Sequence, residues 1–392
     1  MSMSLNRRSL LAGAAAAGLA RPAGAAAPDF GPVGKPSWSA DGPQGAAAAK
    51  GLAFGAAVPS NLLNHSAEFR RILARECGVL LGNNEMKMAV VLPEPGRPDF
   101  APADAIVRFG RAHGQSLRGH ALVWHEALPN WVAPLLDHAS QGQAEDFLRR
   151  WIGTVAGRYR GTIASWDVVN EVLAGYGPVH RADGLRETPW LAALGPDYID
   201  LAFRLAHETD PRAALAWNED SLEHAFDWVE ARRVRALKRL EGMRARGVPI
   251  RRFGIQAHLV GDHPFDPKAF RRFLAELGQF GLGIEITELD IDDKAFPADP
   301  AARDRAVADF LRRFLDVVLD EPAVLNVVTW GLFDGDTWLN DHPDHRRRDG
   351  LRQRPLPLDE MMRPKPFREA LVAAFRHAPD HAATRARLRQ GA

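Results

Sequence analysis

Short apolar segments alternate with longer amphipathic segments along most of this 392-residue chain. The apolar segments are nearly continuous and rich in Val, Ile, Leu and Trp, as expected of parallel strands that are covered on both faces. Eight of them are predicted to be strands, at Leu52–Val58, Val79–Asn84, Ser116–Trp124, Ile163–Asn170, Ala214–Asn218, Arg252–Leu259, Gly283–Leu289 and Val324–Leu332.

The amphipathic segments between them predict helices, because their apolar residues recur at the spacing of one helix face. The clearest lie at Pro102–His113, Ala144–Tyr159, Tyr198–Glu208, Phe226–Arg246, Pro267–Phe280 and Ala301–Asp320. Strand-helix alternation is typical of α/β proteins, and eight such units predict a closed (β/α)8 barrel, or TIM barrel. The alternative is an open doubly wound sheet, which usually carries a Gly-rich phosphate loop after its first strand. Here Val58-Pro59-Ser60-Asn61 stands at that point.

The two ends of the chain differ from its middle. Arg7-Arg8, the Ala-rich apolar run Leu10–Ala20 and small residues up to Ala27 predict an export signal over residues 1–27. The paired arginines favour the twin-arginine route over an ordinary Sec signal. We therefore expect a periplasmic or secreted protein. Residues 28–50 are predicted to be a Gly/Ala/Pro-rich linker, 51–378 a single barrel domain that carries the chemistry, and 379–392 a basic C-terminal tail.

Composition narrows the range of partners. Fifty Lys and Arg residues against forty-nine Asp and Glu leave a formal net charge of +1, which favours neither nucleic acid nor an anionic membrane surface. The single cysteine, Cys77, excludes an intrachain disulfide and a thiolate metal cluster, and we interpret it as a buried core residue. We expect a neutral partner, no cofactor, no metal and a monomeric chain.

Polar residues gather where the predicted strands end. In a barrel of this type the reactive side chains project from the C-terminal ends of the strands. Carboxylates, amides, imidazoles and indoles at one rim indicate a sugar-binding site. The residues at these ends are Asn83, Asn84, Lys87, His120, His125, Asn170, Glu171, Asn218, Gln256, His258, Glu288, Asp290, Trp330 and Trp338.

Two glutamates stand out among them. Glu171 ends Trp166-Asp167-Val168-Val169-Asn170-Glu171 on the fourth predicted strand, and Glu288 lies within Ile286-Thr287-Glu288-Leu289-Asp290 on the seventh. Glycosidic cleavage needs one carboxyl group to protonate the leaving oxygen and a second to attack or to activate water. A single glutamate at a strand end is more often a salt-bridge or capping residue. Two on one barrel rim can meet across it.

The successive motifs resemble those of glycoside hydrolase family 10, the xylanases. The residues that carry the resemblance are Gly119-His120-Ala121-Leu122-Val123-Trp124-His125, Trp166–Glu171, Gln256-Ala257-His258, Ile286–Asp290, Asn84-Glu85-Met86-Lys87, and Pro355-Leu356-Pro357-Leu358-Asp359 with Pro364-Lys365-Pro366. They follow one another in order between Leu52 and Phe375. The resemblance implies a retaining endo-β-1,4-xylanase that acts on xylan and xylo-oligosaccharides.

The same resemblance implies a role for each matching residue. Glu171 would be the acid/base and Glu288 the nucleophile, held by His258, which Asp290 orients. Asn170 would bond the 2-hydroxyl of the sugar being cleaved, where contacts strengthen in the transition state. The other residues expected to bind substrate are Asn84, Lys87, His120, Trp124, His125, Asn218 and Gln256, with Trp330 and Trp338 as the aromatic floor.

Alternatives remain open at this point. Fourteen histidines and the run Asp290-Ile291-Asp292-Asp293 motivate a metal-dependent hydrolase on the same barrel, although the first predicted strand lacks the His pair that such a site usually has. A non-catalytic polysaccharide-binding protein and a β-1,4-glucanase are the other hypotheses.

Individual positions also have simpler interpretations. His120, His125 and Trp124 fit a protein core as well, Asp167 is expected to support the rim without reacting, and residues 345–354 are expected to be a solvated Arg-rich loop. Two positions depart from the family pattern, where Asn83 replaces a glutamate and Ala127 a glutamine. We expect these two changes to weaken the second sugar subsite on the non-reducing side.

Overall fold

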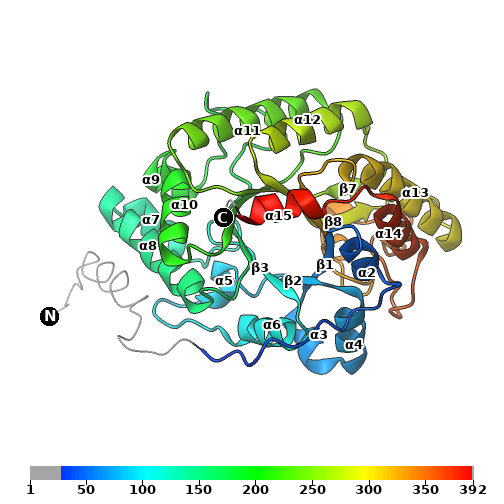
Figure 1. Ribbon diagram of the computed structural model, residues 1–392. Helices are drawn as coiled ribbons and strands as arrows, with labels where there is room; N and C mark the ends of the chain where they lie inside the picture. The colour runs from blue at the N-terminus through cyan, green and yellow to red at the C-terminus, as the bar shows by residue number, and fades with distance from the viewer. Residues whose placement is uncertain (1–27, 391–392) are drawn as a thin grey trace.

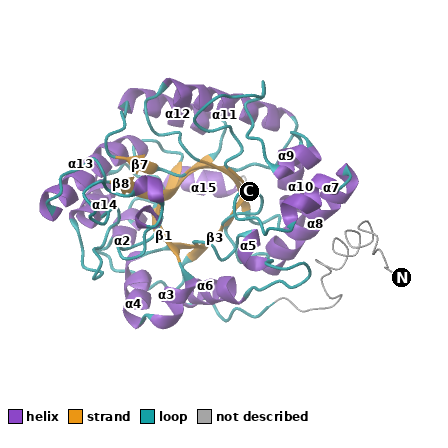
Figure 2. Cartoon of the chain, turned by 180° about the vertical axis from the view of Figure 1, so that it is seen from behind, coloured by secondary structure: helices purple, strands orange, loops and turns teal. Residues whose placement is uncertain are grey.

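The computed structural model describes residues 28–390, so the predicted export signal at residues 1–27 lies outside the described residues. Within this part of the chain, parallel strands form a central barrel and helices surround it (Figures 1 and 2). The strands are β1 Ala53–Val58, β2 Val79–Gly82, β3 Ser116–Gly119, β4 Ser165–Asn170, β5 Ala214–Glu219, β6 Arg252–Ile255, β7 His258–Val260, β8 Gly283–Asp292 and β9 Val324–Thr329.

The strand pairings confirm the predicted barrel. β1 pairs with β2 on one side, where Gly55 lies opposite Val79, and with β9 on the other, where Gly55 lies opposite Val328. β6 pairs directly with β8, so the sheet of the described residues closes on itself, while β7 pairs only with the end of β8. Closure leaves no free edge in the barrel and directs the C-terminal ends of its strands to one rim.

Amphipathic helices cover the outside of the barrel. They are α2 Pro43–Ala48, α3 Ser60–His65, α4 Ala67–Glu76, α5 Met88–Val91, α6 Ala101–Ala112, α7 Val132–His138, α8 Gln141–Arg158, α9 Pro189–Leu194, α10 Tyr198–Thr209, α11 Asp227–Ala245, α12 Pro267–Gln279, α13 Pro300–Val318, α14 Pro366–His377 and α15 Ala382–Gln390. All six helices predicted above are present, with small shifts at their ends. α8 begins before the predicted Ala144, because Ser140 and Gln143 form a capping box.

The inside of the barrel combines apolar and charged side chains. One cluster joins Ala53, Ala57, Val79 and Leu81 to Trp330 near the rim. Deeper charged groups are paired: the guanidinium of Arg118 lies 2.5 Å from a carboxylate oxygen of Asp167 and 3.3 Å from Glu285. Burial of these charges is tolerated because each has an opposite partner and hydrogen bonds.

The predicted linker at residues 28–50 is wrong in part. Pro43–Ala48 forms helix α2, and the side-chain oxygen of Gln44 accepts a hydrogen bond from the backbone N–H of Phe54 in β1 at 2.8 Å. Phe30 is buried and stacks on Tyr159 with ring centroids 5.5 Å apart. The Ala and Gly residues that resemble a linker in composition are small enough to pack closely against the barrel.

The predicted basic tail at residues 379–392 is also wrong where the structure describes it. Ala382–Gln390 forms helix α15, which crosses the N-terminal end of the barrel (Figures 1 and 2). The buried ring of His381 anchors it, with Nδ1 3.0 Å from the carbonyl oxygen of Val324 and Nε2 2.9 Å from that of Leu319. Because these contacts are to backbone atoms, the hydrophobic pattern of the sequence does not predict them.

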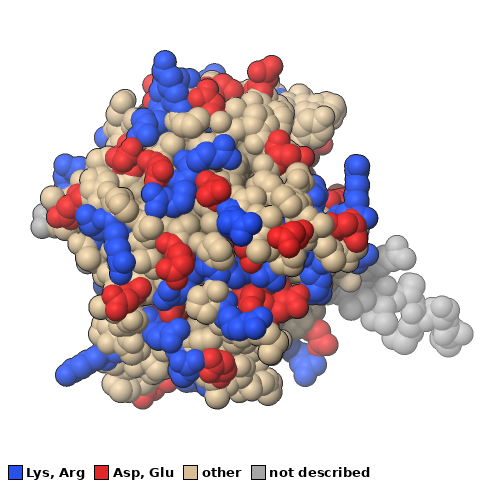
Figure 3. All heavy atoms as spheres, turned by 90° about the vertical axis from the view of Figure 1, so that its right-hand side faces the viewer, with Lys and Arg blue, Asp and Glu red and all other residues tan. Residues whose placement is uncertain are grey.

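The surface agrees with the near-zero net charge. On the face drawn in Figure 3, basic and acidic side chains are interspersed, so this face carries no large field of one sign. Among the described residues, no helix has the length and apolar character needed to cross a membrane.

Candidate active site

Some strands end earlier at the rim than the apolar runs predict, whereas β8 continues past the predicted Leu289 to Asp292. β3 stops at Gly119 where the pattern predicts Trp124, and Gln256-Ala257 separates β6 from β7. Ala257 and Glu171 have φ angles of +62° and +53°, which are uncommon for residues other than glycine and cluster at functional sites. The backbone departs from regular strand where it turns polar side chains toward the barrel axis.

Glu288 on β8 is buried and held from two sides. Its Oε1 accepts a hydrogen bond from the amide of Asn218 at 2.7 Å, and its Oε2 lies 3.2 Å from Nε2 of His258. Burial alone would raise the pKa of Glu288, but the neighbouring His120 and His258 outweigh burial and bring the pKa down to about 2. Glu288 is therefore ionised at neutral pH.

His258 connects Glu288 to Asp290, as the family resemblance implied. Its Nδ1 lies 2.8 Å from Oδ1 of Asp290, and the indole N–H of Trp338 donates to the other Asp290 oxygen at 2.7 Å. Although burial would lower the pKa of His258, the carboxylates of Asp290 and Glu288 outweigh it and raise the pKa well above its usual value. A protonated ring can donate to both carboxylates at once.

A second imidazole approaches Glu288 from β3. Nδ1 of His120 lies 2.8 Å from Asp167 and 4.0 Å from Oε1 of Glu288. Asp167 is fully buried between His120 and Arg118, so it supports the rim as expected.

Glu171 on the rim after β4 has the opposite electrostatic setting. Its Oε1 accepts hydrogen bonds from Gln256 at 2.9 Å and from Asn170 at 3.1 Å. Burial raises the pKa of Glu171 to about 7, the charge of Asp220 adds to this effect, and the Gln256 hydrogen bond opposes it. One carboxyl group thus keeps a proton near neutral pH while the other stays ionised, which is the division of roles that an acid and a nucleophile need.

Asn218 is brought to the site, where it binds Glu288. Its amide nitrogen donates to Glu288 and, at 2.9 Å, to Asn170, and its oxygen accepts from Thr287 at 2.7 Å. The side chain is fully buried. Both N–H groups of Asn218 are thus used within the protein and it holds Glu288 directly, while its expected contact with a sugar stays a prediction.

The remaining expected residues line the same rim. The ammonium of Lys87 donates to Asn84 at 2.9 Å and lies over the rings of Trp124 and Trp330, 4.8 and 5.3 Å from their centroids. Trp338 packs against His258, with centroids 5.1 Å apart. His125, Asn170 and Gln256 lie beside them around Glu171.

Comparison with known proteins identifies the family. Residues 44–374 match the glycosyl hydrolase family 10 domain. The chain belongs to glycosyl hydrolase family 10.

Among family 10 relatives, a β-1,4-xylanase of Dictyoglomus thermophilum is 32% identical over 80% of this chain and 85% of its own length. Endo-1,4-β-xylanase B of Thermotoga neapolitana is 30% identical over 78% of this chain and 82% of its own length. Among solved structures, xylanase 10B of Thermotoga petrophila in complex with xylobiose superposes with a TM-score of 0.76 and 28% identity, covering 85% of this chain and 97% of that one.

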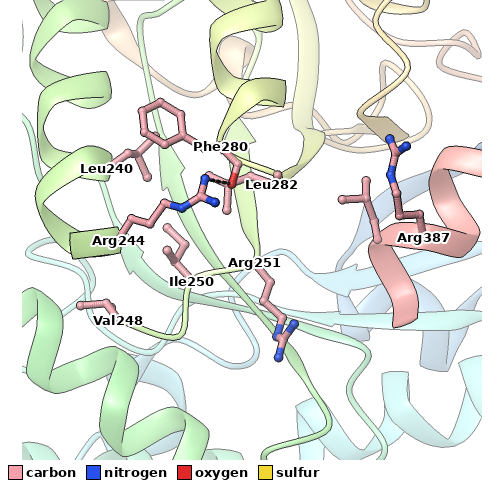
Figure 4. A pocket seen from close by; sticks show the side chains of 10 residues that line it. Leu240, Arg244, Val248, Ile250, Arg251, Phe280, Leu282 and Arg387 are labelled. Atoms are coloured by element: carbon pink, nitrogen blue, oxygen red, sulfur yellow. Dashed lines mark hydrogen bonds between the residues drawn. The ribbon is translucent and has the colours of Figure 1, made fainter. Parts of the chain in front are cut away.

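The structure also has a cavity away from the family 10 site. This cavity of about 350 Å³ lies between α11, α15 and the loops at residues 248–251 and 280–282, and its lining contains no Asp or Glu. Figure 4 shows Arg244 in this cavity, donating to the backbone oxygen of Phe280 at 2.8 Å. Among residues 28–390, His125, Glu126 and Glu171 have possible metal-ligand atoms within 4.8 Å of one another. This possible metal site includes Glu171, which is also one of the two glutamates of the family 10 site.

Sequence reasoning missed several residues around the family 10 site. Asp220 directly follows Glu219, the last residue of β5, so its position at a strand end could have indicated it. Arg186 lies in the long loop after β4 and has no such signal.

The predicted solvated loop at residues 345–354 is partly buried: the guanidinium of Arg347 lies 2.9 Å from Asp293. Cys77 is buried, as interpreted.

Proposed function

We propose that the protein is a retaining endo-β-1,4-xylanase in which Glu288 is the nucleophile and Glu171 the acid/base. The observation that carries this proposal is the opposite electrostatic setting of two glutamates on one family 10 rim. The pKa of Glu288 is about 2 and that of Glu171 about 7. Family membership and the xylanases among its relatives support xylan as the substrate.

The reaction proceeds in two displacements. In the first, an oxygen of Glu288 bonds to the anomeric carbon while Glu171 gives its proton to the glycosidic oxygen, so that the carbon–oxygen bond breaks and the leaving sugar departs as an alcohol. In the second, the Glu171 carboxylate takes a proton from water as the water oxygen attacks the same carbon and frees Glu288. Two inversions retain the anomeric configuration.

The other rim residues serve substrate binding and orientation. Asn170 faces the 2-hydroxyl of the sugar being cleaved, and Asn84, Lys87, His120 and Gln256 bind the hydroxyls of the glycon. Trp330 and Trp338 form the floor under the pyranose rings. Support comes from Nδ1 of His125, a buried nitrogen that lacks a hydrogen-bond partner among the described residues. Buried polar atoms are rarely left unpaired unless a ligand or water completes them.

The product mixture and its stereochemistry test the proposal. The purified mature chain is incubated with xylan and, separately, with carboxymethylcellulose, and the released sugars are identified. Xylo-oligosaccharides from xylan, with little release from the glucan, are expected. Predominant release from the glucan would favour the β-1,4-glucanase alternative. Proton magnetic resonance of fresh product from xylan should show the β-anomer first, and an initial α-anomer would contradict the assigned roles.

A metal-dependent hydrolase is the second candidate, motivated by the proximity of His125, Glu126 and Glu171. The carboxyl pair requires no metal, so activity should persist in excess chelator. Loss of activity in chelator, restored by a divalent metal, would favour the second candidate.

We also infer that the protein is exported and acts as a monomer. Arg7-Arg8 and the apolar run that follows support the twin-arginine route. Replacing both arginines with lysine should retain the precursor inside the producing cell, whereas a Sec substrate would still be exported. Light scattering of the purified chain tests the monomer.

A further inference from the structure

Next to the acid/base lies a charge cluster, defined here as the buried Glu219 and Arg232 with the partly exposed Asp220 and Arg186. Arg232 on α11 is fully buried, and its Nη2 lies 2.6 Å from Glu219 and 2.6 Å from Oδ1 of Asp220. Glu219 in turn accepts hydrogen bonds from the backbone N–H groups of Val172, at 3.1 Å, and Leu173. The cluster therefore fixes the chain immediately after Glu171.

Arg186 links this charge cluster to Glu171 itself. Its Nε donates to the backbone carbonyl of Glu171 at 2.9 Å, and its Nη2 lies 3.4 Å from Oδ1 of Asp220. Asp220 also accepts a hydrogen bond from Ser221 at 2.8 Å. One guanidinium thus joins the acid/base backbone to a carboxylate that Arg232 and Ser221 hold in place.

We propose that Asp220 is a positioning residue for the reaction, which strengthens the hold of Glu171 on its proton by a fixed negative charge that the chemistry does not consume. This inference rests on the proposed function of Glu171. Glu288 and burial also raise the pKa of Glu171, but their effects change during the reaction. Glu288 loses its charge when it becomes an ester with the sugar, whereas Asp220 keeps its charge through both displacements. Burial of Glu171 changes as substrate enters and leaves.

The consequence differs between the two half-reactions. In the first, a stronger hold on the proton keeps Glu171 in its acid form at higher pH. In the second, after Glu288 has been neutralised, Asp220 still makes Glu171 a stronger base toward water. A general acid/base works best when its pKa lies near the working pH. The pKa of Glu171, about 7, is raised first by burial and next by Asp220, and less by Glu288.

Charged groups from several elements face Glu171 or Asp220, and each contributes to the pH dependence. They are Glu288 on β8, Lys87 after β2, His125 and Glu126 after β3, Arg186 after β4, Glu219 and Glu223 at and after β5, and Arg232 on α11. Arg232 and Arg186 favour the ionised form of Asp220, and its pKa is lowered although burial alone would raise it. Asp220 is thus charged over the working range.

Two variants that change the charge in opposite directions, Asp220→Asn and Arg186→Gln, test whether Asp220 acts on Glu171 through its charge. An electrostatic role predicts pKa shifts of opposite sign, whereas a structural role does not. Asp220→Asn should lower the pKa of the alkaline limb of kcat/KM on xylopentaose by about half to one unit, since it removes a negative charge that favours the protonated form of Glu171. Arg186→Gln should raise it, because the positive charge that offsets Asp220 is gone. The leaving group of a dinitrophenyl xylobioside needs no proton. On this substrate, Asp220→Asn should therefore not change the alkaline limb of kcat/KM.

The matched control is Asp200→Asn, which removes a carboxylate paired with Arg246 at 2.6 Å on the outer helix α10. Asp200→Asn should not shift the pKa of the alkaline limb of kcat/KM on xylopentaose. Titration of the ¹³C-labelled Glu171 carboxyl in the absence of substrate gives the same comparison independently of activity, so it stays informative if the protein does not cleave xylan. Unchanged Glu171 titration in folded Asp220→Asn, or shifts in the same direction in both cluster variants, would overturn the proposal.

Discussion

Asn218 on β5 donates a hydrogen bond at 2.7 Å to Glu288 on β8, and the strand β6 lies between these two strands. Asn218 also donates to Asn170 at 2.9 Å and accepts from Thr287 at 2.7 Å, so both of its N–H groups are used within the protein. An amide in this position orients the nucleophile and ties it to the residue beside the acid/base. It also lowers the cost of burying an ionised carboxylate, because hydrogen bonding favours the charged form.

We therefore predict that Asn218→Ala lowers kcat far more than it raises KM. Loss of one hydrogen bond to a buried charge costs about 1.5 to 3 kcal/mol, or roughly 10- to 100-fold in rate if it is made in the transition state. Steady-state kinetics on xylopentaose provide the measurement. A change in KM alone would instead support the sugar-binding role predicted from the sequence.

Removing each catalytic carboxyl group should have a different consequence. Glu288→Ala cannot form the glycosyl-enzyme, so activity should fall by several orders of magnitude on every substrate. Glu171→Ala should still cleave an activated aryl xylobioside in the first step, because that leaving group needs no proton, and the intermediate should then accumulate. Pre-steady-state release of the aryl group distinguishes the two. Equal losses in both variants on both substrates would contradict the assignment.

Ionisation of Glu171 should lower the free energy of unfolding of the protein. Its pKa of about 7 lies above the ordinary 4.5, so the folded state binds the proton more tightly than the unfolded state. Stability is then lost as pH rises from about 4.5 through about 7, where the buried group must ionise. We expect Glu171→Gln to stabilise the fold at pH 8 by about 1 to 3 kcal/mol and to have little effect at pH 4.

Denaturant unfolding at both pH values measures this difference. The exposed Glu241→Gln on α11 serves as the control and should show no pH-dependent gain. A stabilisation of Glu171→Gln that is equal at pH 4 and pH 8 would mean that the gain does not come from ionisation.

The helix α15 should contribute stability without contributing to catalysis. His381→Ala removes both backbone contacts of the buried ring, which should cost about 1 to 3 kcal/mol of unfolding free energy. Because α15 lies at the end of the barrel opposite the carboxyl pair, kcat/KM at 25 °C should stay within twofold. The exposed Arg387→Ala on the same helix should change stability by less than about 0.5 kcal/mol. Reduced kcat/KM in folded His381→Ala would argue against this separation.

The sequence predicts the barrel well because its order depends on alternating hydrophobic segments, which one chain displays directly. It predicts Glu171 and Glu288 because strand-end position and motif order coincide there. It does not predict the role of Asn218, because the partners of a buried amide depend on which strands face each other. Arg186 and His381 escape prediction for a related reason: both act through backbone carbonyl oxygens, which have no sequence signature.

The two departures from the family pattern follow neighbouring strands, β2 and β3. Asn83 is partly buried at the end of β2, and Ala127 has a φ of +48° and accepts a hydrogen bond from the backbone N–H of Ala89 at 2.8 Å. Beside Ala127 lies a cavity of about 10 Å³, bordered by Lys87 and Trp124. That volume is roughly the size of one water molecule, so the cavity is too small to hold a glutamine side chain in place of Ala127.

We predict that Asn83→Glu together with Ala127→Gln strengthens the second glycon subsite. Each restored hydrogen bond should contribute about 1 kcal/mol, or roughly fivefold in affinity, and the one from a charged carboxylate somewhat more. Remote binding of this kind also lowers the reaction barrier, so kcat/KM on xylotriose or an aryl xylobioside should rise severalfold. An aryl xyloside, which does not reach the second subsite, is the control substrate and should be unaffected. If the double variant is unchanged on xylotriose, other residues build this subsite, and the transfer of family roles fails at positions 83 and 127.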